Sequence, residues 1–205
     1  MTRPTLSARS PNQTRESILA AARRQFGERG FHATSVQTIV DEAGVTKGAL
    51  YHHFESKDEI LRLIHDEFIE AELQQARDIV ARELPPRDTL ALIMESLVDS
   101  LDTYLDSIEI FFRERYLLSQ DVMAEIRAKR DELEGLVVQT LERGVADGSF
   151  RPQPSLKVAA FGVIGICAWG YQWYRQGGPM RGREIGRMYA SMVLEGLEAP
   201  GRRTD

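Results

Sequence analysis

The apolar positions near the start of the chain follow the period of short helices rather than of strands. Four of them recur at i, i+3, i+4 and i+7: Val36, Ile39, Val40 and Ala43. Thr34 and Gln37 have capping-box spacing at the start of this predicted helix, and Gly44 ends it, because glycine adopts a left-handed conformation cheaply. The pattern predicts a helix that packs one face on a core.

The next predicted helix is too short to be stable by itself. Thr46 caps its start, and Leu50 and Phe54, one turn apart, anchor it to the core. The outward positions are then Thr46, Lys47, Gly48, Ala49, Tyr51 and His52. Ser56 begins a further helix. Two short helices joined by a glycine turn are typical of a helix-turn-helix that reads DNA.

The remainder of the chain also has helical periodicity, and no segment has the alternation of a strand. Expected helices cover roughly 12–29, 57–84, 87–105, 108–118, 121–146, 155–176 and 182–197. We therefore predict an all-α protein with a DNA-binding domain at 12–57 and an effector-binding and dimerisation domain at 58–198. Residues 1–11 read as a disordered arm whose Arg3 and Arg9 could reach a minor groove or the DNA backbone, or stay without a DNA contact.

The net charge of −5 conceals an asymmetry between the two parts of the chain. Residues 1–57 hold eight Lys/Arg and five Asp/Glu, a net +3, and the remainder is at −8. Phosphate contact depends on the local field, so the basic head suits DNA and the acidic body disfavours it.

Between Lys157 and Arg175 the sequence carries no charge. Because a membrane span needs about 20 apolar residues, the stretch at 158–174, which includes three glycines, is better read as a buried helix. We expect it to form a homodimer interface together with the last helix, with Gly162 and Gly170 allowing close approach.

The head closely resembles the signature of the TetR family of transcriptional regulators. The resemblance lies in Ala43-Gly44-Val45-Thr46-Lys47-Gly48 and Leu50-Tyr51-His52-His53-Phe54, with Phe26, Gly30-Phe31, Thr34, Val36, Ile39, Ser56-Lys57 and Leu61. It implies a cytoplasmic homodimer that binds a palindromic DNA operator and leaves it when a small molecule binds. Lys47, Gly48 and Ala49 would then approach base edges. The residues that would hold phosphates are Thr34, Thr46, Tyr51, His52 and Lys57.

A second resemblance concerns the effector. The run Trp173-Tyr174-Arg175-x-Gly177-Gly178-Pro179 is similar to members of that family that regulate lipid and steroid catabolism and sense acyl-CoA thioesters. It implies an apolar pocket walled by Met94, Leu97, Phe111, Phe112, Tyr116 and Trp169. Arg113 and Arg175 would supply cations for the phosphates of the nucleotide, and Trp173 would supply a ring for its adenine.

Other classes of function find less support in the sequence. No nucleophile elbow, P-loop or zinc-protease motif is present, so we expect no enzyme, metal site or cofactor. The single cysteine, Cys167, indicates a reducing cytoplasm. A repressor that senses a cationic aromatic drug and an architectural DNA-binding protein without a ligand remain the alternatives.

Overall fold

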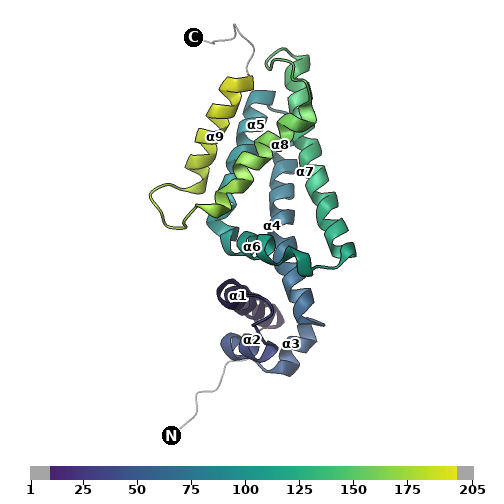
Figure 1. Cartoon of the computed structure of the whole chain (residues 1–205), viewed down its shortest axis with the longest axis vertical. Coiled ribbons are helices and arrows are strands. Elements are labelled where there is room, and N and C mark those ends of the chain that lie inside the picture. Colours follow the sequence, from purple (N-terminus) through teal and green to yellow (C-terminus); the bar gives the residue numbers. More distant parts are fainter. Residues whose placement is uncertain (1–9, 198–205) are drawn as a thin grey trace.

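The computed structural model describes residues 10–197, and all of its regular elements are helical, which confirms the all-α prediction. Figure 1 shows a small head built from the first three helices below a larger body. The α-helices are α1 Pro11–Arg29, α2 Val36–Ala43, α3 Lys47–His53, α4 Lys57–Val80, α5 Pro86–Asp99, α6 Leu101–Glu114, α7 Gln120–Ala146, α8 Leu156–Ala168 and α9 Gly182–Leu197. Short 3-10 turns follow α6 and α8, at Arg115–Leu117 and Trp169–Gln172. The arm with Arg3 and Arg9 lies outside the described residues.

The head is held by local caps and a compact apolar core. Thr46 Oγ1 accepts a hydrogen bond from the Ala49 N–H at 3.1 Å, and Gly44 has a left-handed φ of 66°, both as predicted. The start of α2 differs from the prediction, because its cap is Ser35, whose Oγ accepts from Thr38 N–H at 3.0 Å. The fully buried side chains at the centre include Ile18, Ala22, Phe26, Ile39, Leu50 and Ile64.

Helix α4 belongs to both parts of the molecule. Its first half packs Ile60 and Ile64 into the core of the head, and its second half packs Phe68 and Leu73 into the core of the body. The two cores therefore divide within α4, after the boundary predicted from sequence at 57/58. In Figure 1 this helix runs as a rod from the head into the body.

One predicted helix is broken in the structure. The sequence predicts a helix over 87–105, but α5 ends at Asp99 and α6 starts at Leu101. Ser100 Oγ lies 2.8 Å from the carbonyl oxygen of Leu97, the group that Leu101 N–H would bind in a continuous helix. Beyond Ser100, α6 turns away to pass beneath the body, toward α1 (Figure 1).

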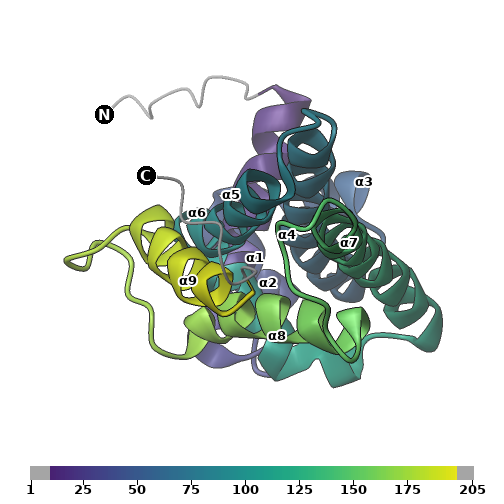
Figure 2. The ribbon, with the colours of Figure 1, turned by 90° about the horizontal axis from the view of Figure 1, so that it is seen from above.

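Helices α8 and α9 cover one face of the body, as the view from above shows in Figure 2. The α-helical part of α8 ends at Ala168, earlier than predicted, and Gly170 lies in the 3-10 turn that follows. A Cβ at Gly170 would lie 2.6 Å from Leu101 Cδ1, so this glycine packs inside its own chain. Gly186 lets α9 approach α5, since a Cβ there would meet Glu95 Cα at 2.7 Å.

A buried histidine marks the middle of α4, between the two cores. His65 is fully buried, and its ring packs edge-on to Phe111 with centroids 5.1 Å apart. Neither ring nitrogen has a hydrogen-bond partner within the described chain. Burial lowers the pKa of His65 to about 4, so the ring is neutral near pH 7.

We predict that His65 makes the protein acid-labile. The unfolded chain has an ordinary histidine pKa of about 6.5, so it binds a proton that the folded state rejects. The contribution of His65 to the free energy of unfolding is therefore fully present above about pH 6.5 and is lost as the pH falls toward 4. At pH 5 the loss is about 2 kcal/mol. His65→Leu should remove this loss, measured by urea unfolding at fixed protein concentration between pH 5 and 7.5.

The quantity compared is the difference in the free energy of unfolding between His65→Leu and wild type at each pH, because other groups also titrate in this range. His32→Gln, at an exposed histidine, is the control and should keep the wild-type slope. Parallel pH profiles for wild type and His65→Leu would contradict the assignment.

Candidate DNA-binding helix and effector cavity

Helix α3 presents the predicted outward face to solvent. Lys47, Gly48 and His52 are exposed, and Tyr51 keeps 54% of its surface accessible. Leu50 and Phe54 are buried beneath them, as the spacing predicts. The short helix is thus held by its inner side chains and leaves its polar side chains free for a partner.

Gly48 has no steric role within its own chain. A Cβ built there would meet only Thr46 Oγ1, at 3.8 Å, which is ordinary van der Waals contact. The glycine leaves a shallow surface on the exposed side of α3, where a ligand backbone can come close.

Two of the residues predicted to hold phosphates serve the interior of the head instead. Thr34 is 1% exposed, and its Oγ1 donates to the Gly30 carbonyl at 2.8 Å. Lys57 is partly buried; its Nζ donates to the carbonyls of Phe31 and Thr34, each at 2.8 Å, and lies over the Phe31 ring. Burial lowers the pKa of the Lys57 ammonium. Both side chains fix the loop between α1 and α2.

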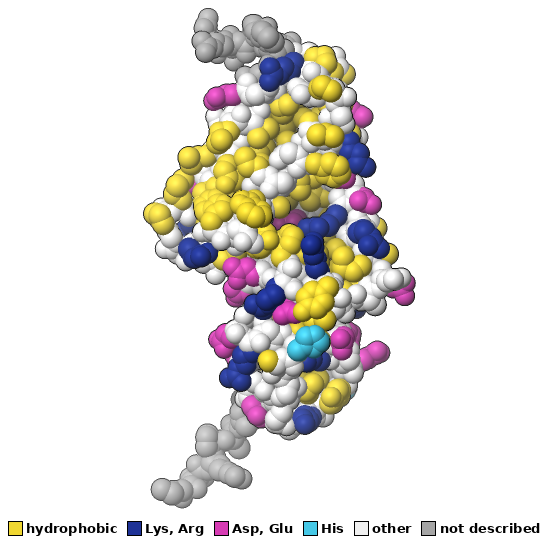
Figure 3. Space-filling model, viewed as in Figure 1, with side chains coloured by type: hydrophobic (Ala, Val, Ile, Leu, Met, Phe, Trp, Pro, Cys, Tyr) yellow, Lys and Arg dark blue, Asp and Glu magenta, His cyan; other side chains and the backbone are white. Residues whose placement is uncertain are grey.

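A cavity of about 430 Å³ lies in the body between α4, α5, α7 and α8. Its walls are largely apolar, with a polar side that comes from α4 and α7. The lining residues are Ile69, Glu72, Leu97, Arg127, Lys129, Arg130, Asp131, Leu133, Glu134, Phe161, Ile164, Gly165 and Ala168. Volume and composition are those of a small-molecule site. Figure 3 shows this face of the body hollowed beside a group of Lys and Arg side chains.

Of the residues predicted to line the effector pocket, only Leu97 lies in this cavity. Met94 and Phe111 are core residues, at 0% and 1% exposure. Tyr116 and Trp169 are exposed at the surface. The remaining predicted side chains line other depressions: Trp173 and Arg175 an apolar groove at α9, and Phe112, Arg113 and Arg175 a shallow hollow with Tyr171.

Arg113 has a different partner from the one predicted. Its guanidinium donates to the carbonyl oxygens of Phe26 and Gly27 at the end of α1, the latter at 3.1 Å. Next to it, the buried Glu114 carboxylate accepts from Phe31 N–H at 3.3 Å. These two side chains of α6 therefore join the body to the head.

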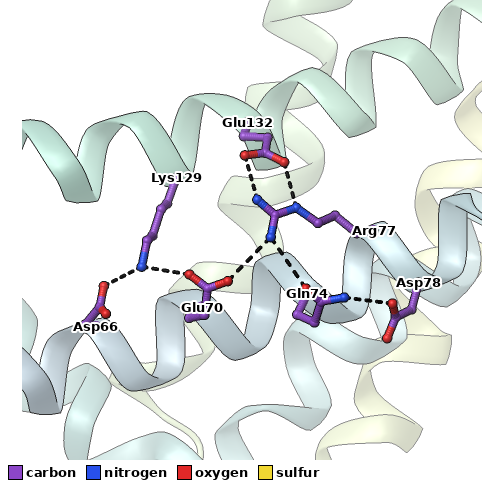
Figure 4. A network of polar contacts seen from close by, with 7 residues as sticks. All are labelled: Asp66, Glu70, Gln74, Arg77, Asp78, Lys129 and Glu132. Carbon is purple, nitrogen blue, oxygen red and sulfur yellow. Dashed lines mark hydrogen bonds and ion pairs between the residues drawn. The ribbon is translucent and has the colours of Figure 1, made fainter.

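The cation-bearing side of the cavity comes from α7, which the sequence did not indicate. Lys129 is neutralised by Asp66 and Glu70, at 2.5 and 2.7 Å, and Arg77 pairs with Glu132 (Figure 4). Among residues 10–197, neither Arg127 nor Arg130 has a carboxylate within 4.0 Å. The Arg130 guanidinium lies over the Phe111 ring, 5.2 Å from its centre, and burial lowers its pKa.

A broad apolar surface extends over α8 and α9 (Figure 3). Its exposed large side chains are Val158, Phe161, Trp169, Trp173, Met180, Met188 and Met192. Such a surface is larger than scattered exposed residues and indicates an association face. Gly162, exposed on α8, lies in it, whereas Gly170 is buried.

The described part of the chain contains no group of three His, Cys, Asp or Glu side chains arranged for a metal ion. Cys167 is buried, and burial raises the pKa of its thiol to about 12, so it is unreactive. Within residues 10–197 no helix has the length and apolar character that a membrane crossing needs.

Comparison with known proteins agrees with this architecture. Residues 18–64 match the family model for bacterial regulatory proteins of the tetR family, and residues 83–197 match the tetracyclin repressor-like C-terminal domain. The transcriptional repressor KstR2 of Rhodococcus jostii is 34% identical over 188 residues, 91% of this chain and 92% of that protein.

Solved structures show the same fold. The ketosteroid transcriptional regulator KstR2 of Mycobacterium tuberculosis superposes with a TM-score of 0.83 at 28% identity, over 96% of this chain and all of that one. AibR, solved with isovaleryl coenzyme A and operator DNA, has a TM-score of 0.76 at 24% identity, over 88% of this chain and 98% of that one.

The exposed α3, the cavity in the body and these matches lead to one conclusion: the chain belongs to the TetR family and is a ligand-responsive, DNA-binding transcriptional repressor that acts as a dimer.

Proposed function

We propose that the effector releasing this repressor from its operator is an acyl-CoA thioester. The observation that carries the proposal is an apolar cavity of about 430 Å³ with Arg127 and Arg130 at one side. The acyl group would occupy the space between Ile69, Leu133 and Ile164. A thioester of coenzyme A matches this layout because it joins an apolar group to phosphates.

Arg127 is the residue best placed to meet the phosphates. It lines the cavity and also an adjoining hollow with Arg115 and Tyr116, so it lies where a ligand would leave the interior. The body as a whole is acidic, and an anion must therefore gain its affinity from local charge-assisted hydrogen bonds. Isovaleryl coenzyme A in AibR gives a chemical precedent in the same fold.

A cationic aromatic drug is the competing effector class. Glu72, Asp131 and Glu134 also line the cavity and would attract a cation. Glu134 is within 3.4 Å of Lys157, however, and the carboxyl group of Glu72 is stabilised in its neutral form by burial, which raises its pKa to about 7. The cavity therefore attracts a cation less strongly than its number of acidic residues implies.

For DNA, we propose that Lys47, Gly48 and Ala49 approach base edges and that Thr46, Tyr51 and His52 hold phosphates. All lie on the exposed side of α3, apart from the partly covered Ala49. Ser35, exposed at the start of α2, replaces Thr34 as the proposed phosphate contact there.

We predict that Lys47→Ala weakens operator binding by about 1–3 kcal/mol and alters sequence preference, because it removes a base contact.

Gly48→Ala should raise helix stability by up to about 1 kcal/mol and yet weaken operator binding, since its new methyl group meets DNA rather than protein. Fluorescence anisotropy with the operator and thermal unfolding measure the two effects. Tyr51→Phe, which loses one phosphate contact, should weaken all sequences alike.

An increase in stability without loss of affinity in Gly48→Ala would show that α3 does not approach the groove. Unchanged affinity of Lys47→Ala for every sequence tested would exclude that side chain from recognition.

We propose that the dimer forms through the apolar surface of α8 and α9, as a four-helix bundle with the same helices of the second copy. Met188 and Met192, one turn apart on α9, are 55% and 63% exposed. We predict that the double variant Met188→Glu, Met192→Glu sediments as a folded monomer at micromolar concentration and loses most operator affinity, because one head makes half the contacts.

Gln139→Glu adds a charge at an exposed position of α7 and is the matched control, which should remain dimeric. A double variant that remains dimeric would rule out this face.

We predict that thioesters release the operator and that Arg127→Ala raises the concentration required by roughly tenfold or more, the value of a lost charge-assisted hydrogen bond. Operator affinity without effector should stay unchanged. The assay compares a panel of acyl-CoA thioesters with the matching free acids and with lipophilic cations. Arg175→Ala, at the cation predicted from sequence, is the matched control and should respond like wild type.

Release by free acids or cations, with no effect of any thioester, would overturn the proposed effector class. Loss of the response in Arg175→Ala, with Arg127→Ala unaffected, would move the phosphate site to the groove at α9.

A further inference from the structure

One carboxyl group faces the effector cavity without an ionic partner. Glu72, on α4, lines the cavity together with Leu97, Leu133 and Ile164. Its Oε1 lies 2.8 Å from Ser100 Oγ, and no residue of the described chain donates a hydrogen bond to its Oε2. Arg130, whose charge lowers the pKa of Glu72, has no nitrogen within 4.0 Å of that carboxyl group and lies over the Phe111 ring.

The hydrogen bonds of Ser100 restrict where the protons lie. Ser100 Oγ is 2.8 Å from Glu72 Oε1 and also 2.8 Å from the Leu97 carbonyl oxygen. A hydroxyl has one proton and cannot donate to both. Both contacts are satisfied when the Glu72 carboxyl is protonated, donates to Ser100 Oγ, and Ser100 donates to Leu97.

The electrostatic surroundings agree with this arrangement. Burial raises the pKa of Glu72 to about 7, although a hydrogen bond donated by Ser100 and the charge of Arg130 would each favour the carboxylate. The neutral acid is then well populated at neutral pH. With its proton committed to Ser100, its Oε2 is a carbonyl oxygen that accepts hydrogen bonds from the cavity.

We propose that Glu72 and Ser100 form a polar subsite in the effector cavity, and that this subsite selects effectors whose acyl group carries a hydroxyl. The inference rests on the cavity being the effector site. A hydroxyl can donate to Oε2, a ketone has no proton to donate, and an unsubstituted hydrocarbon in the cavity would cover this oxygen without giving it a partner. A site built to bind a hydroxyl discriminates strongly against analogues that lack it, because its polar group is left unpaired.

The test uses matched CoA thioesters of cyclohexanecarboxylic acid and of its hydroxy- and oxo-substituted forms, with the substituent at each ring position. Operator release is measured with the full-length dimer. In wild type, at least one hydroxylated isomer should act at a concentration about tenfold or more below that of the unsubstituted and oxo forms.

Two variants at Glu72 separate hydrogen bonding from packing. Glu72→Gln should keep the preference, because its amide donates to Ser100 Oγ and its carbonyl still accepts. Glu72→Leu should lose it and favour the unsubstituted ring. Equal preference in wild type and Glu72→Leu would overturn the inference even if every thioester released DNA.

A second measurement does not depend on coenzyme A. The thermal unfolding midpoint of the dimer is measured with cyclohexanol, cyclohexanone and methylcyclohexane at equal concentration. Cyclohexanol should raise it most in wild type and Glu72→Gln and lose that advantage in Glu72→Leu. If this pattern appears while no thioester releases DNA, the subsite stands and the proposed effector class fails. If the three compounds act alike in all proteins, the subsite is wrong.

Discussion

The contact between α6 and the end of α1 is the constraint on which the orientation of the head depends. The last carbonyl groups of a helix lack partners within the helix, and here the Arg113 guanidinium from the body donates to that of Gly27. It also donates to the carbonyl of Phe26, which accepts from Gly30 N–H as well. Glu114 binds the Phe31 N–H, and the fully buried Ile110 belongs to the core of the head. Since the head is small and its recognition helix short, any shift of α6 is passed directly to the surface that meets DNA.

Helix α4 is the second mechanical link, and its partners define how it moves. The carboxylates of Asp66 and Glu70 bind Lys129, and Arg77 binds Glu132, so ionic contacts run along the seam between α4 and α7 (Figure 4). Exposed pairs of this kind contribute little stability each. They join two helices that pack against each other and both line the cavity. A ligand in the cavity therefore acts on the rod that also carries Ile60 and Ile64 into the head.

The sequence predicted what local chemistry determines. The caps at Thr46 and Ser56, the left-handed Gly44 and the buried pair Leu50 and Phe54 depend on neighbours a few residues away, so their spacing was sufficient. The cavity depends on which helices meet, and spacing carries no such information. Nothing in the spacing distinguished Arg127 and Arg130 as cavity residues, and Arg113 was predicted to be a ligand cation although it binds α1. The break at Ser100 was hidden because a serine in an apolar helix pattern reveals neither its rotamer nor its partner.

Two ionisable groups on one side of α4 indicate how a small ligand can influence so long a helix. His65 and Glu72 are seven residues apart, two helical turns; His65 is fully buried, and Glu72 is half-buried where it lines the cavity. The histidine is neutral without a hydrogen-bond partner, and the carboxyl group keeps one oxygen without a donor. The buried histidine costs stability that leucine would not, so the packing of α4 is weaker than its apolar neighbours alone would give. A ligand that fills the cavity covers the free oxygen of Glu72, and a ligand that also donates to it binds best in the arrangement of α4 that places Glu72 within its reach. Differential binding of this kind is the source of free energy by which an effector can shift the orientation of the two heads.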